Sequence, residues 1–396
     1  MSCIITEDDN TQPREEIQKF GTMTKDVLAM AQWFKDNNVF DVAMESTGVY
    51  WKPIFNILES EGINVTLVNA RHIKNLPGRK TDIQDAQWIA ELFRNGLISA
   101  SFIPPKEIRE LRDLNRTRRK LIEERTRIKN RIEKILQDSN IKLSSAISNV
   151  FGVSGRALIS TLPTEMNISE EDIRGMVKGQ LKKKIDTIAS ALEGKLTDTN
   201  KFLLNQHINH LEFLEGLIQE IEVKIEEKML EFHDESELIQ SITGICSTAA
   251  SAIIAEIGVD MNRFPDERHL SSWAAICPGN YESAGKKKSG RTRRGNNYLK
   301  GILTECAWAA SRTKNTEFST YYQKMVRKKG KKRALIALAH KMLIEIYRVL
   351  KSGEPYVESG HQIIALAEKR KEENLIQKLE RMGYLIQKVE ARAESC

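Results

Sequence analysis

The sequence is poor in the residues that cross-link or anchor a fold. Its five cysteines are spread over 396 residues and no two of them form a CxxC pair. This spacing excludes a disulfide framework and the common zinc sites, and it favours reduced thiols in the cytoplasm. No run of about eighteen apolar residues occurs, and the N-terminus has no basic segment followed by an apolar one, so we expect neither a membrane span nor a secretory signal.

Charge, in contrast, is abundant and slightly unbalanced. Lys and Arg number 61 against 54 Asp and Glu, a formal net charge of +7. This balance favours anionic partners such as nucleic acid, and local clustering of the cations is stronger evidence for them than the total. The length suits about two or three domains. We predict the segments 1–105, 106–236, 237–352 and a charged helical tail at 353–396.

The first hundred residues alternate strand and helix patterns. Short apolar runs at 3–6 and 16–20 flank a polar stretch and predict a β-hairpin. The elements predicted after it are a strand at 39–44, a helix at 49–58, a strand at 64–68, a helix at 82–93 and a strand at 97–103. Strands joined by helices in this order predict a sheet with crossover helices. The predicted fold class is therefore α/β for this part and all-α for the rest.

Two long helices are predicted in the middle of the chain. The first runs from 108 to 138, after Pro104 and Pro105 end the α/β part. Apolar residues recur every seven positions in both helices, at Leu114, Leu121, Ile128 and Ile135 and then at Leu204, Leu211, Ile218, Ile225 and Phe232. Seven-residue spacing is typical of helix packing. We expect a helical hairpin or coiled coil, formed either as a dimerisation arm or within one chain.

The other faces of the first helix are basic. Between residues 109 and 134 eleven Lys and Arg stand against five Asp and Glu. This excess predicts a rod that binds a nucleic-acid backbone, and a solvated helix surface is the alternative.

A compact, mostly helical segment is predicted from 237 onward. The run 242–246, with Gly244 between apolar residues, precedes a small-residue helix at 249–257 and resembles a helix-hairpin-helix. Such a turn exposes backbone N–H groups to phosphate oxygens. A simple turn between two helices is the alternative, because Cys246 stands where a second glycine is usual.

Three carboxylates of the α/β part form a metal-type set. Glu45 ends a predicted strand, and Asp82 and Asp85 are three apart at the start of a helix, so they share one face. Hard divalent ions such as Mg²⁺ prefer carboxylate oxygen, and in phosphoryl transfer such carboxylates hold the metal on the phosphate. Alternatively, Asp82 caps the helix and Asp85 complements its dipole.

A serine precedes a strongly basic loop in the C-terminal segment. Ser283 lies between Glu282 and Ala284, and the seven basic residues from Lys286 to Lys300 meet no acidic one. We expect nucleic-acid contacts from Lys286, Lys287, Lys288, Arg291, Arg293 and Arg294, and from Lys328 and Lys329 in a second basic run. An accessible serine beside cations suits nucleophilic attack on phosphate, although Ser283 by itself reads only as a loop serine.

Four segments together resemble the DEDD-type transposases of bacterial insertion sequences, which include the Piv-like DNA invertases. They are Ala43 to Pro53, Asn69 to His72, Gly78 to Ala86 and the loop from Pro278 to Gly295. The likeness covers roughly residues 1 to 350 in the family's order.

The resemblance implies an RNase H/RuvC-like N-terminal domain, a coiled-coil insertion and a C-terminal domain with a catalytic serine. It implies that Glu45, Asp82 and Asp85 are the second, third and fourth members of a tetrad that binds Mg²⁺. It further implies that Ser283 attacks DNA to give a phosphoserine link. Family members are also implied to act on DNA as homo-oligomers, dimers or tetramers, and some use a bridge RNA encoded by their element.

One departure from the family pattern concerns its first aspartate. That residue lies in a strand before the one that aligns with Cys3 to Thr6, and Asp8 and Asp9 fall in the expected hairpin turn. We therefore expect this chain to lack one ligand and one strand. The leading interpretation is a DNA transposase or site-specific recombinase. The alternatives are an inactive nucleic-acid-binding remnant and a junction nuclease that uses metal alone.

Overall fold

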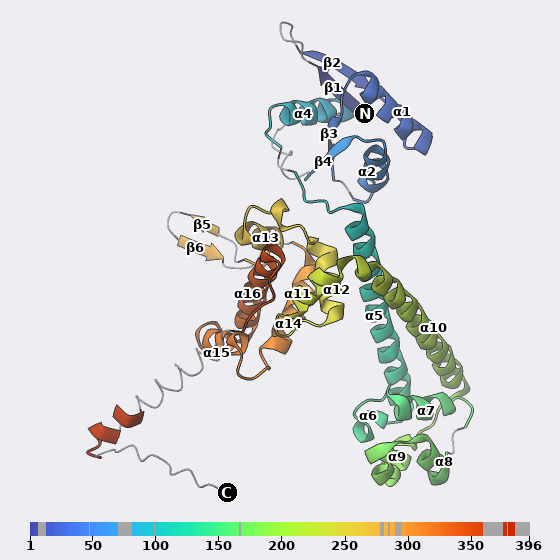
Figure 1. Cartoon of the computed structure of the whole chain (residues 1–396). Coiled ribbons are helices and arrows are strands. Elements are labelled where there is room, and N and C mark those ends of the chain that lie inside the picture. The colour runs from blue at the N-terminus through green and yellow to red at the C-terminus, as the bar shows by residue number, and fades with distance from the viewer. Residues whose placement is uncertain are drawn as a thin grey trace. The chain divides into compact units, whose positions relative to one another are not determined.

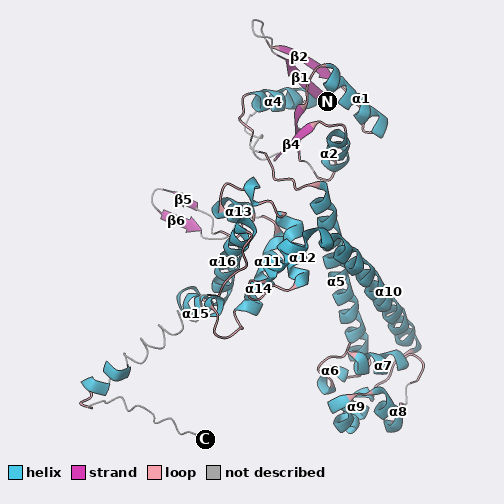
Figure 2. Ribbon diagram, viewed as in Figure 1, coloured by secondary structure: helices cyan, strands magenta, loops and turns pink. Residues whose placement is uncertain are grey.

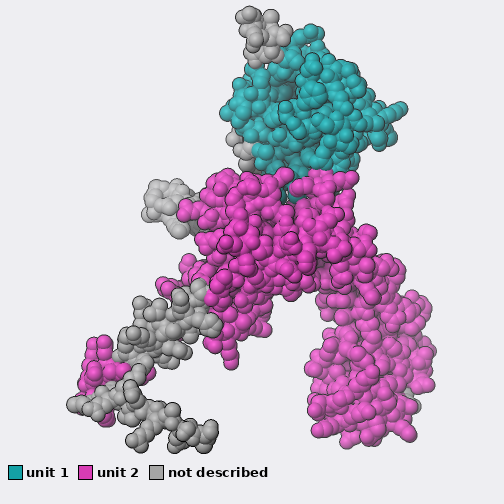
Figure 3. All heavy atoms as spheres, in the orientation of Figure 1, with its two compact units in different colours: residues 1–104 teal, residues 105–396 magenta. Residues whose placement is uncertain are grey.

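The computed structural model shows a largely helical chain with small sheets (Figure 2). It describes residues 1–6, 13–46, 48–69, 81–98, 100–165, 168–277, 281–283, 286–289, 295–358, 375–377 and 379–384. The chain divides into two compact units, residues 1–104 and 105–396 (Figure 3).

The first unit opens with the predicted hairpin. Strands β1 (Ser2–Thr6) and β2 (Arg14–Gln18) pair antiparallel, with Ser2 opposite Gln18 and Thr6 opposite Arg14. The second strand begins two residues earlier than its apolar run suggested. Ile17, the apolar residue of this strand, is exposed, while Phe20 lies beyond the strand and packs against the core.

The crossover unit that follows confirms most of the strand and helix predictions. Strands β3 (Asp41–Glu45) and β4 (Asn64–Val68) are parallel and are joined by helix α2 (Trp51–Ser60). The predicted strand at 97–103 is wrong for the residues that the structure describes. Ala100 makes a single antiparallel bridge to Val68 there, and the prolines that follow cannot donate to a ladder.

Two further helices complete this unit. Helix α4 (Asp82–Arg94) has the predicted position and contacts strands β1 and β3. Helix α1 (Thr24–Asp36) was not predicted, although its buried residues Val27, Met30, Ala31 and Phe34 have the spacing of one helix face. They form the core of the unit with Ile4, Leu58 and Ile63.

The second unit begins with a helical hairpin, which we call the arm (Figure 1). Helices α5 (Lys106–Asp138) and α10 (Asp198–Met229) pack along each other. Early residues of α5 meet late residues of α10, as in the ion pair of Glu110 with Lys228 at 2.6 Å, so the helices are antiparallel. The predicted seams therefore pack within one chain. Their members Ile128, Ile135, Leu204, Leu211, Ile218 and Ile225 are buried.

Short helices close the far end of the arm. They are α6 (Leu143–Ala146), α7 (Val153–Thr161), α8 (Glu170–Met176), the 3-10 helix η1 (Gly179–Lys184) and α9 (Ile185–Leu192). Their buried leucines and isoleucines continue the core between α5 and α10. None of the helices of this tip is predicted from the sequence pattern.

The rest of the unit is the compact helical segment predicted from 237. It comprises η2 (Leu230–Phe232), α11 (His233–Gln240), α12 (Ser247–Ile257), η3 (Met261–Arg263), α13 (Glu267–Trp273), β5 (Tyr281–Ser283), β6 (Lys286–Ser289), α14 (Asn297–Ala310), α15 (Glu317–Lys329) and α16 (Lys331–Ser352). Helix α16 lies against α11, α13, α14 and α15. The charged tail predicted from 353 lies mostly outside the described residues.

The candidate helix-hairpin-helix is a turn between α11 and α12. Gly244 has a φ of +94°, and a Cβ at this position would lie 2.8 Å from the backbone nitrogen of Ala310 and from the backbone oxygen of Cys306. The glycine therefore fits the turn against the backbone of α14. This packing agrees with the alternative, a turn between two helices, and the phosphate-binding role stays a prediction.

Across the described part of the chain, no helix is both long and apolar enough to cross a bilayer.

Candidate functional site

The basic loop leaves the helical segment and returns to it at one place. Ala275 follows helix α13 with a φ of +55°, and Gly295 lies where a Cβ would come 2.3 Å from the Cβ of Ala275. Only a residue without a side chain can make this approach. The residues before and after the segment 278–294 thus lie together, so both ends of the loop are fixed on the helical segment.

The described part of this loop is a two-stranded antiparallel sheet. Strand β5 ends at Ser283, which is paired with Lys286, the first residue of β6. Tyr281 is paired with Ser289, and the register shifts by one residue between Tyr281 and Glu282. Of the predicted contact residues, Lys286, Lys287 and Lys288 belong to β6. Arg291, Arg293 and Arg294 lie outside the described residues.

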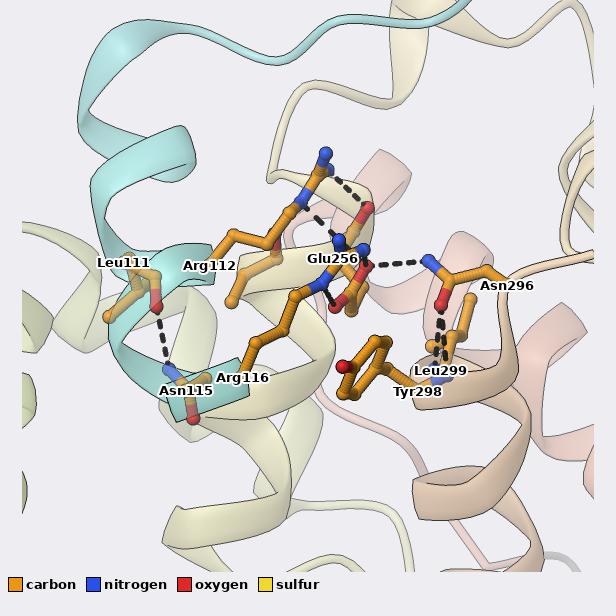
Figure 4. Close-up of polar contacts among 9 residues, drawn as sticks. Leu111, Arg112, Asn115, Arg116, Glu256, Asn296, Tyr298 and Leu299 are labelled. Atoms are coloured by element: carbon orange, nitrogen blue, oxygen red, sulfur yellow. Dashed lines mark hydrogen bonds and ion pairs between the residues drawn. The ribbon is translucent and has the colours of Figure 1, made fainter. Parts of the chain in front are cut away.

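A buried carboxylate holds the returning end of the loop. Asn296 is the N-cap of α14, and its Oδ1 accepts hydrogen bonds from the backbone N–H groups of Tyr298 and Leu299 at 3.1 Å. Its Nδ2 donates to Oε2 of Glu256 at 2.5 Å (Figure 4). Asparagine is among the best N-caps because its side chain supplies acceptors to unpaired N–H groups. Here its amide also ties α14 to α12.

The arm holds the same carboxylate from the other side. Arg116 of α5 donates from Nε and Nη2 to the two oxygens of Glu256, each at 2.8 Å (Figure 4). Two parallel N–H···O bonds fix geometry as well as adding energy. We call Arg112, Arg116, Glu256 and Asn296 the Glu256 network. It joins α5, α12 and the first residue after the basic loop within one unit.

Arg112 completes the network at the end of α12. Its Nε donates to the carbonyl oxygen of Ala255 and its Nη2 to that of Glu256, both at 2.8 Å. The last carbonyls of a helix have no partner inside it, and a cation there complements the helix dipole. Burial lowers the pKa of Arg112 to about 10 against the opposing effect of Glu256, so the guanidinium remains charged at neutral pH.

These contacts correct the prediction of a basic rod. Arg112 and Arg116 bind Glu256, and Arg118 donates from Nε to Glu222 of α10 at 2.7 Å. Arg112 and Arg116 tie the arm to α12, and Arg118 ties α5 to α10 within the arm, so these three arginines are engaged in contacts within the protein. The remaining basic residues of α5, among them the exposed Lys120, Arg127, Arg131 and Lys134, keep that role as a prediction.

The three carboxylates of the first unit lie at the ends of two adjacent elements. Glu45 is the last residue of β3, and Asp82 and Asp85 are in the first turn of α4. Thr81, not Asp82, is the N-cap of α4, because its Oγ1 accepts a hydrogen bond from the N–H of Gln84. Capping therefore does not explain Asp82.

The metal prediction does not follow from this arrangement. Within the described residues, no three His, Cys, Asp or Glu side chains come together as a group that could hold a metal ion. Carboxylate oxygens remain the donors that Mg²⁺ prefers. Residues 70–80, which include most of the segment Asn69 to His72 and the start of the segment Gly78 to Ala86, lie outside the described residues, as does Thr47.

Two residues that anchor the loop, Asn296 and Glu256, are not among those predicted from the sequence. Asn296 carries a recognisable signal, an Asn directly before a helix after a glycine. Glu256 carries none, because a single acid in a small-residue helix is ordinarily exposed. Only the contact with α5, 140 residues earlier in the chain, shows its role.

Comparison with known proteins gives matches over both halves of this architecture. A family model described as a transposase of the DEDD, IS110 type matches residues 2–141, and a second, described as the transposase IS116/IS110/IS902 family, matches residues 236–323. The first span contains Glu45, Asp82, Asp85 and Arg116, and the second contains Glu256, Ser283 and Asn296. Together the two spans cover more than half of the chain.

Curated relatives agree with these matches. The transposase for insertion sequence element IS1111A of Coxiella burnetii is 25% identical over 324 residues, which are 80% of this chain and 79% of that protein. The insertion element IS110 uncharacterized 43.6 kDa protein of Streptomyces coelicolor is 28% identical over 130 residues, 32% of each chain. These matches do not favour an inactive remnant. Two family models in sequence order and a transposase that is similar along most of its length show that the chain belongs to the IS110 family of insertion-sequence transposases.

Proposed function

We propose that the chain cleaves and joins DNA at the ends of an insertion sequence, with Ser283 as the nucleophile. The observation that carries the proposal is the anchored β5–β6 hairpin, in which Ser283 pairs with the first of three consecutive lysines. A backbone pair in a short, held hairpin keeps a serine and a cationic strand at a constant spacing. Positioning of this kind is a large part of catalysis in phosphoryl transfer.

The proposed step is a transesterification at a DNA phosphodiester. The Oγ of Ser283 attacks phosphorus, the Oγ–P bond forms, and the bond from phosphorus to one deoxyribose oxygen breaks. The serine proton passes to a base, and the leaving oxygen takes up a proton. Cations of β6 and the following residues lower the energy of the extra negative charge on the phosphate in the transition state. The step needs no oxidant or reductant.

The Glu256 network supports this role by holding the loop. The loop returns through Asn296 to a carboxylate that is 2% exposed and fixed by two hydrogen bonds from Arg116. The residues that hold Asn296 belong to α5 and α12, so the returning end of the loop is fixed by helices and not by other loops. Sites built on such elements keep their geometry better than sites on free loops.

The test is the formation of a covalent protein–DNA adduct. Labelled DNA that carries the ends of the element is incubated with the protein and separated under denaturing conditions. We expect an adduct that survives detergent and disappears on protease digestion. Ser283→Ala should abolish it while changing the DNA affinity by no more than about tenfold, since one neutral hydroxyl contributes roughly 0.5–1.5 kcal/mol at most.

Ser289→Ala is the matched control, since Ser289 lies on the same hairpin at the paired end of β6. This variant should keep the adduct. An adduct that persists in Ser283→Ala and vanishes in Ser289→Ala would assign the nucleophile to Ser289.

We also propose that Glu45, Asp82 and Asp85 support cleavage as Mg²⁺ ligands in an RNase H-like domain. What supports this is the chemistry of the donors and the match of this region to the DEDD type. Bound there, Mg²⁺ would neutralise charge on the phosphate. Glu45→Gln and Asp82→Asn should each abolish magnesium-dependent cleavage with DNA binding retained, and full cleavage by either variant would show that its carboxylate is structural.

Two features of the proposal concern partners. The family resemblance predicts a homo-oligomer with composite sites and, in some members, a bridge RNA that selects the DNA. Light scattering of the protein with and without DNA measures the first, and sequencing of RNA that copurifies with the protein tests the second.

A further inference from the structure

One face of helix α15 carries a polar stripe that ends in cations. Ser319, Thr320, Gln323, Lys324, Arg327 and Lys328 recur at intervals of three and four residues, so they share one side of the helix. The opposite side carries Phe318 and Tyr322, both buried and facing the core with α16. Apolar packing on one side therefore turns the hydroxyls and cations outward.

The loop between α14 and α15 forms a second wall beside this stripe. Residues 311–315 and the α15 face line a groove of about 1000 Å³. The loop is well held: the hydroxyls of Ser311 and Thr313 donate to carbonyls of α14 at 2.8 and 3.3 Å, and Thr316 caps α15. Asn315 closes the turn with a φ of +61°, which asparagine tolerates.

The lining of the groove is cationic. Five of its eleven lining residues are Lys or Arg (Arg312, Lys314, Lys324, Arg327 and Lys328), and none is Asp or Glu. The nearest acid in sequence, Glu317, forms an ion pair with Lys341 of α16, the helix that packs against α15. No acidic side chain among the lining residues therefore neutralises the cations of the groove.

An aromatic ring lies beside the groove. The guanidinium carbon of Arg312 is 4.2 Å from the ring centroid of Trp308, a residue that is 43% exposed. Stacking orients the guanidinium plane, and an arginine held this way recognises phosphate with less loss of side-chain freedom.

We propose that this groove binds the sugar-phosphate backbone of one polynucleotide strand, at a site separate from the β5–β6 hairpin. Cations, hydroxyls and amides without carboxylates are the donor set that contacts phosphate and sugar, and they carry little base specificity. The inference deepens the proposed function, since it names a second nucleic-acid contact of the same protein. It does not depend on Ser283 being the nucleophile.

The test is the salt dependence of binding, measured by fluorescence anisotropy on the full chain. The groove variant is Lys324→Gln, Arg327→Gln and Lys328→Gln together, three exposed positions where glutamine suits a helix. Each phosphate contact contributes about 0.7 to the slope of log affinity against log salt for a single strand, so losing three contacts should lower the slope by about 2. Probes are a single-stranded DNA, an RNA of the same sequence, the DNA duplex and poly-glutamate.

The matched control is Lys182→Gln, Lys183→Gln and Lys184→Gln together, which removes the same charge from exposed positions at the tip of the arm. We expect the slope of log affinity against log salt to fall by about 2 in the groove variant and to change by less than about 0.5 in the control. The probe with the greater loss, DNA or RNA, identifies the strand.

Several outcomes separate the ideas being tested. Equal losses in the two variants would overturn the groove site, because only net charge would then matter. Loss confined to poly-glutamate would overturn it as well, in favour of an acidic peptide. If the wild-type protein bound no polynucleotide in a salt-dependent way, the proposed function itself would fail. If the wild-type protein bound polynucleotide in a salt-dependent way and the groove variant bound it equally well, the groove proposal would be refuted and the proposed function would stand.

Discussion

The Glu256 network supplies the sharpest prediction about stability. Glu256→Gln keeps the size of the side chain and removes its charge, so that Arg112 and Arg116 lose their common anion. The side chain of Glu256 is 3% exposed, and those of Arg112 and Arg116 are 16% and 35% exposed. The change therefore leaves one poorly solvated guanidinium and one partly solvated guanidinium without a counter-charge.

The expected cost follows from this burial. Breaking a buried ion pair by removing one partner costs about 3–5 kcal/mol. About a third of the Arg116 side chain is exposed to solvent, and the amide oxygen of a glutamine at position 256 can still accept a hydrogen bond from the arginines. We therefore expect the low end of the range, about 3 kcal/mol, which corresponds to roughly a hundredfold change in the local opening equilibrium.

Hydrogen exchange at the amides of α12 and the first turn of α14 measures this change locally. The local measurement is preferable because a chain with two compact units need not unfold in one transition. Glu215→Gln is the control: Glu215 also accepts two hydrogen bonds from one arginine, Arg156, but both side chains are about 30% exposed. We expect Glu215→Gln to lower the free energy of local opening around the Glu215–Arg156 pair by about 1 kcal/mol or less. Protection in α12 that falls less than threefold in Glu256→Gln would refute the account of the network.

Two further predictions concern the turn into α12 and the arm. Gly244→Ala should destabilise the protein by about 2 kcal/mol or more, because the φ of Gly244 is +94° and a Cβ would meet backbone atoms of α14. Gly216→Ala, at a position in α10 where a Cβ meets no other atom, should stabilise the protein by about 0.5–1 kcal/mol. Thermal unfolding of both variants measures these changes, and equal shifts of the melting temperature in the two variants would contradict the prediction. The hydrogen bond from Arg156 holds the pKa of Glu215 below its ordinary 4.5. Since the folded pKa is lowered, this carboxylate contributes its full stabilisation above about pH 4.5 and loses it as pH falls through the folded value. The stability difference between wild type and Glu215→Gln should therefore shrink between pH 5 and pH 3, and a difference constant with pH would count against the pair.

The sequence by itself determined most of the local structure that periodicity specifies. Strands of β-branched residues, the heptad seams and the proline break at 104–105 predicted β3, β4, α4 and α5 within a few residues of their observed bounds. These features follow from side-chain spacing alone, since a helix or strand must turn its apolar residues to one side. The basic loop and Ser283 were also visible in sequence, as was the family.

Tertiary structure alone decided what the charged residues do. In sequence, Arg112, Arg116 and Arg118 are indistinguishable from the other cations of the basic helix, and Glu256 is one acid among many. Their roles depend on partners more than a hundred residues away, which local patterns do not encode. The predicted strand at 97–103 makes only a single bridge to β4 among the described residues, from Ala100 to Val68, which its apolar run did not indicate. Whether a charged side chain forms a buried ion pair or remains exposed to bind a ligand depends on its exposure to solvent, which is fixed only when the chain folds.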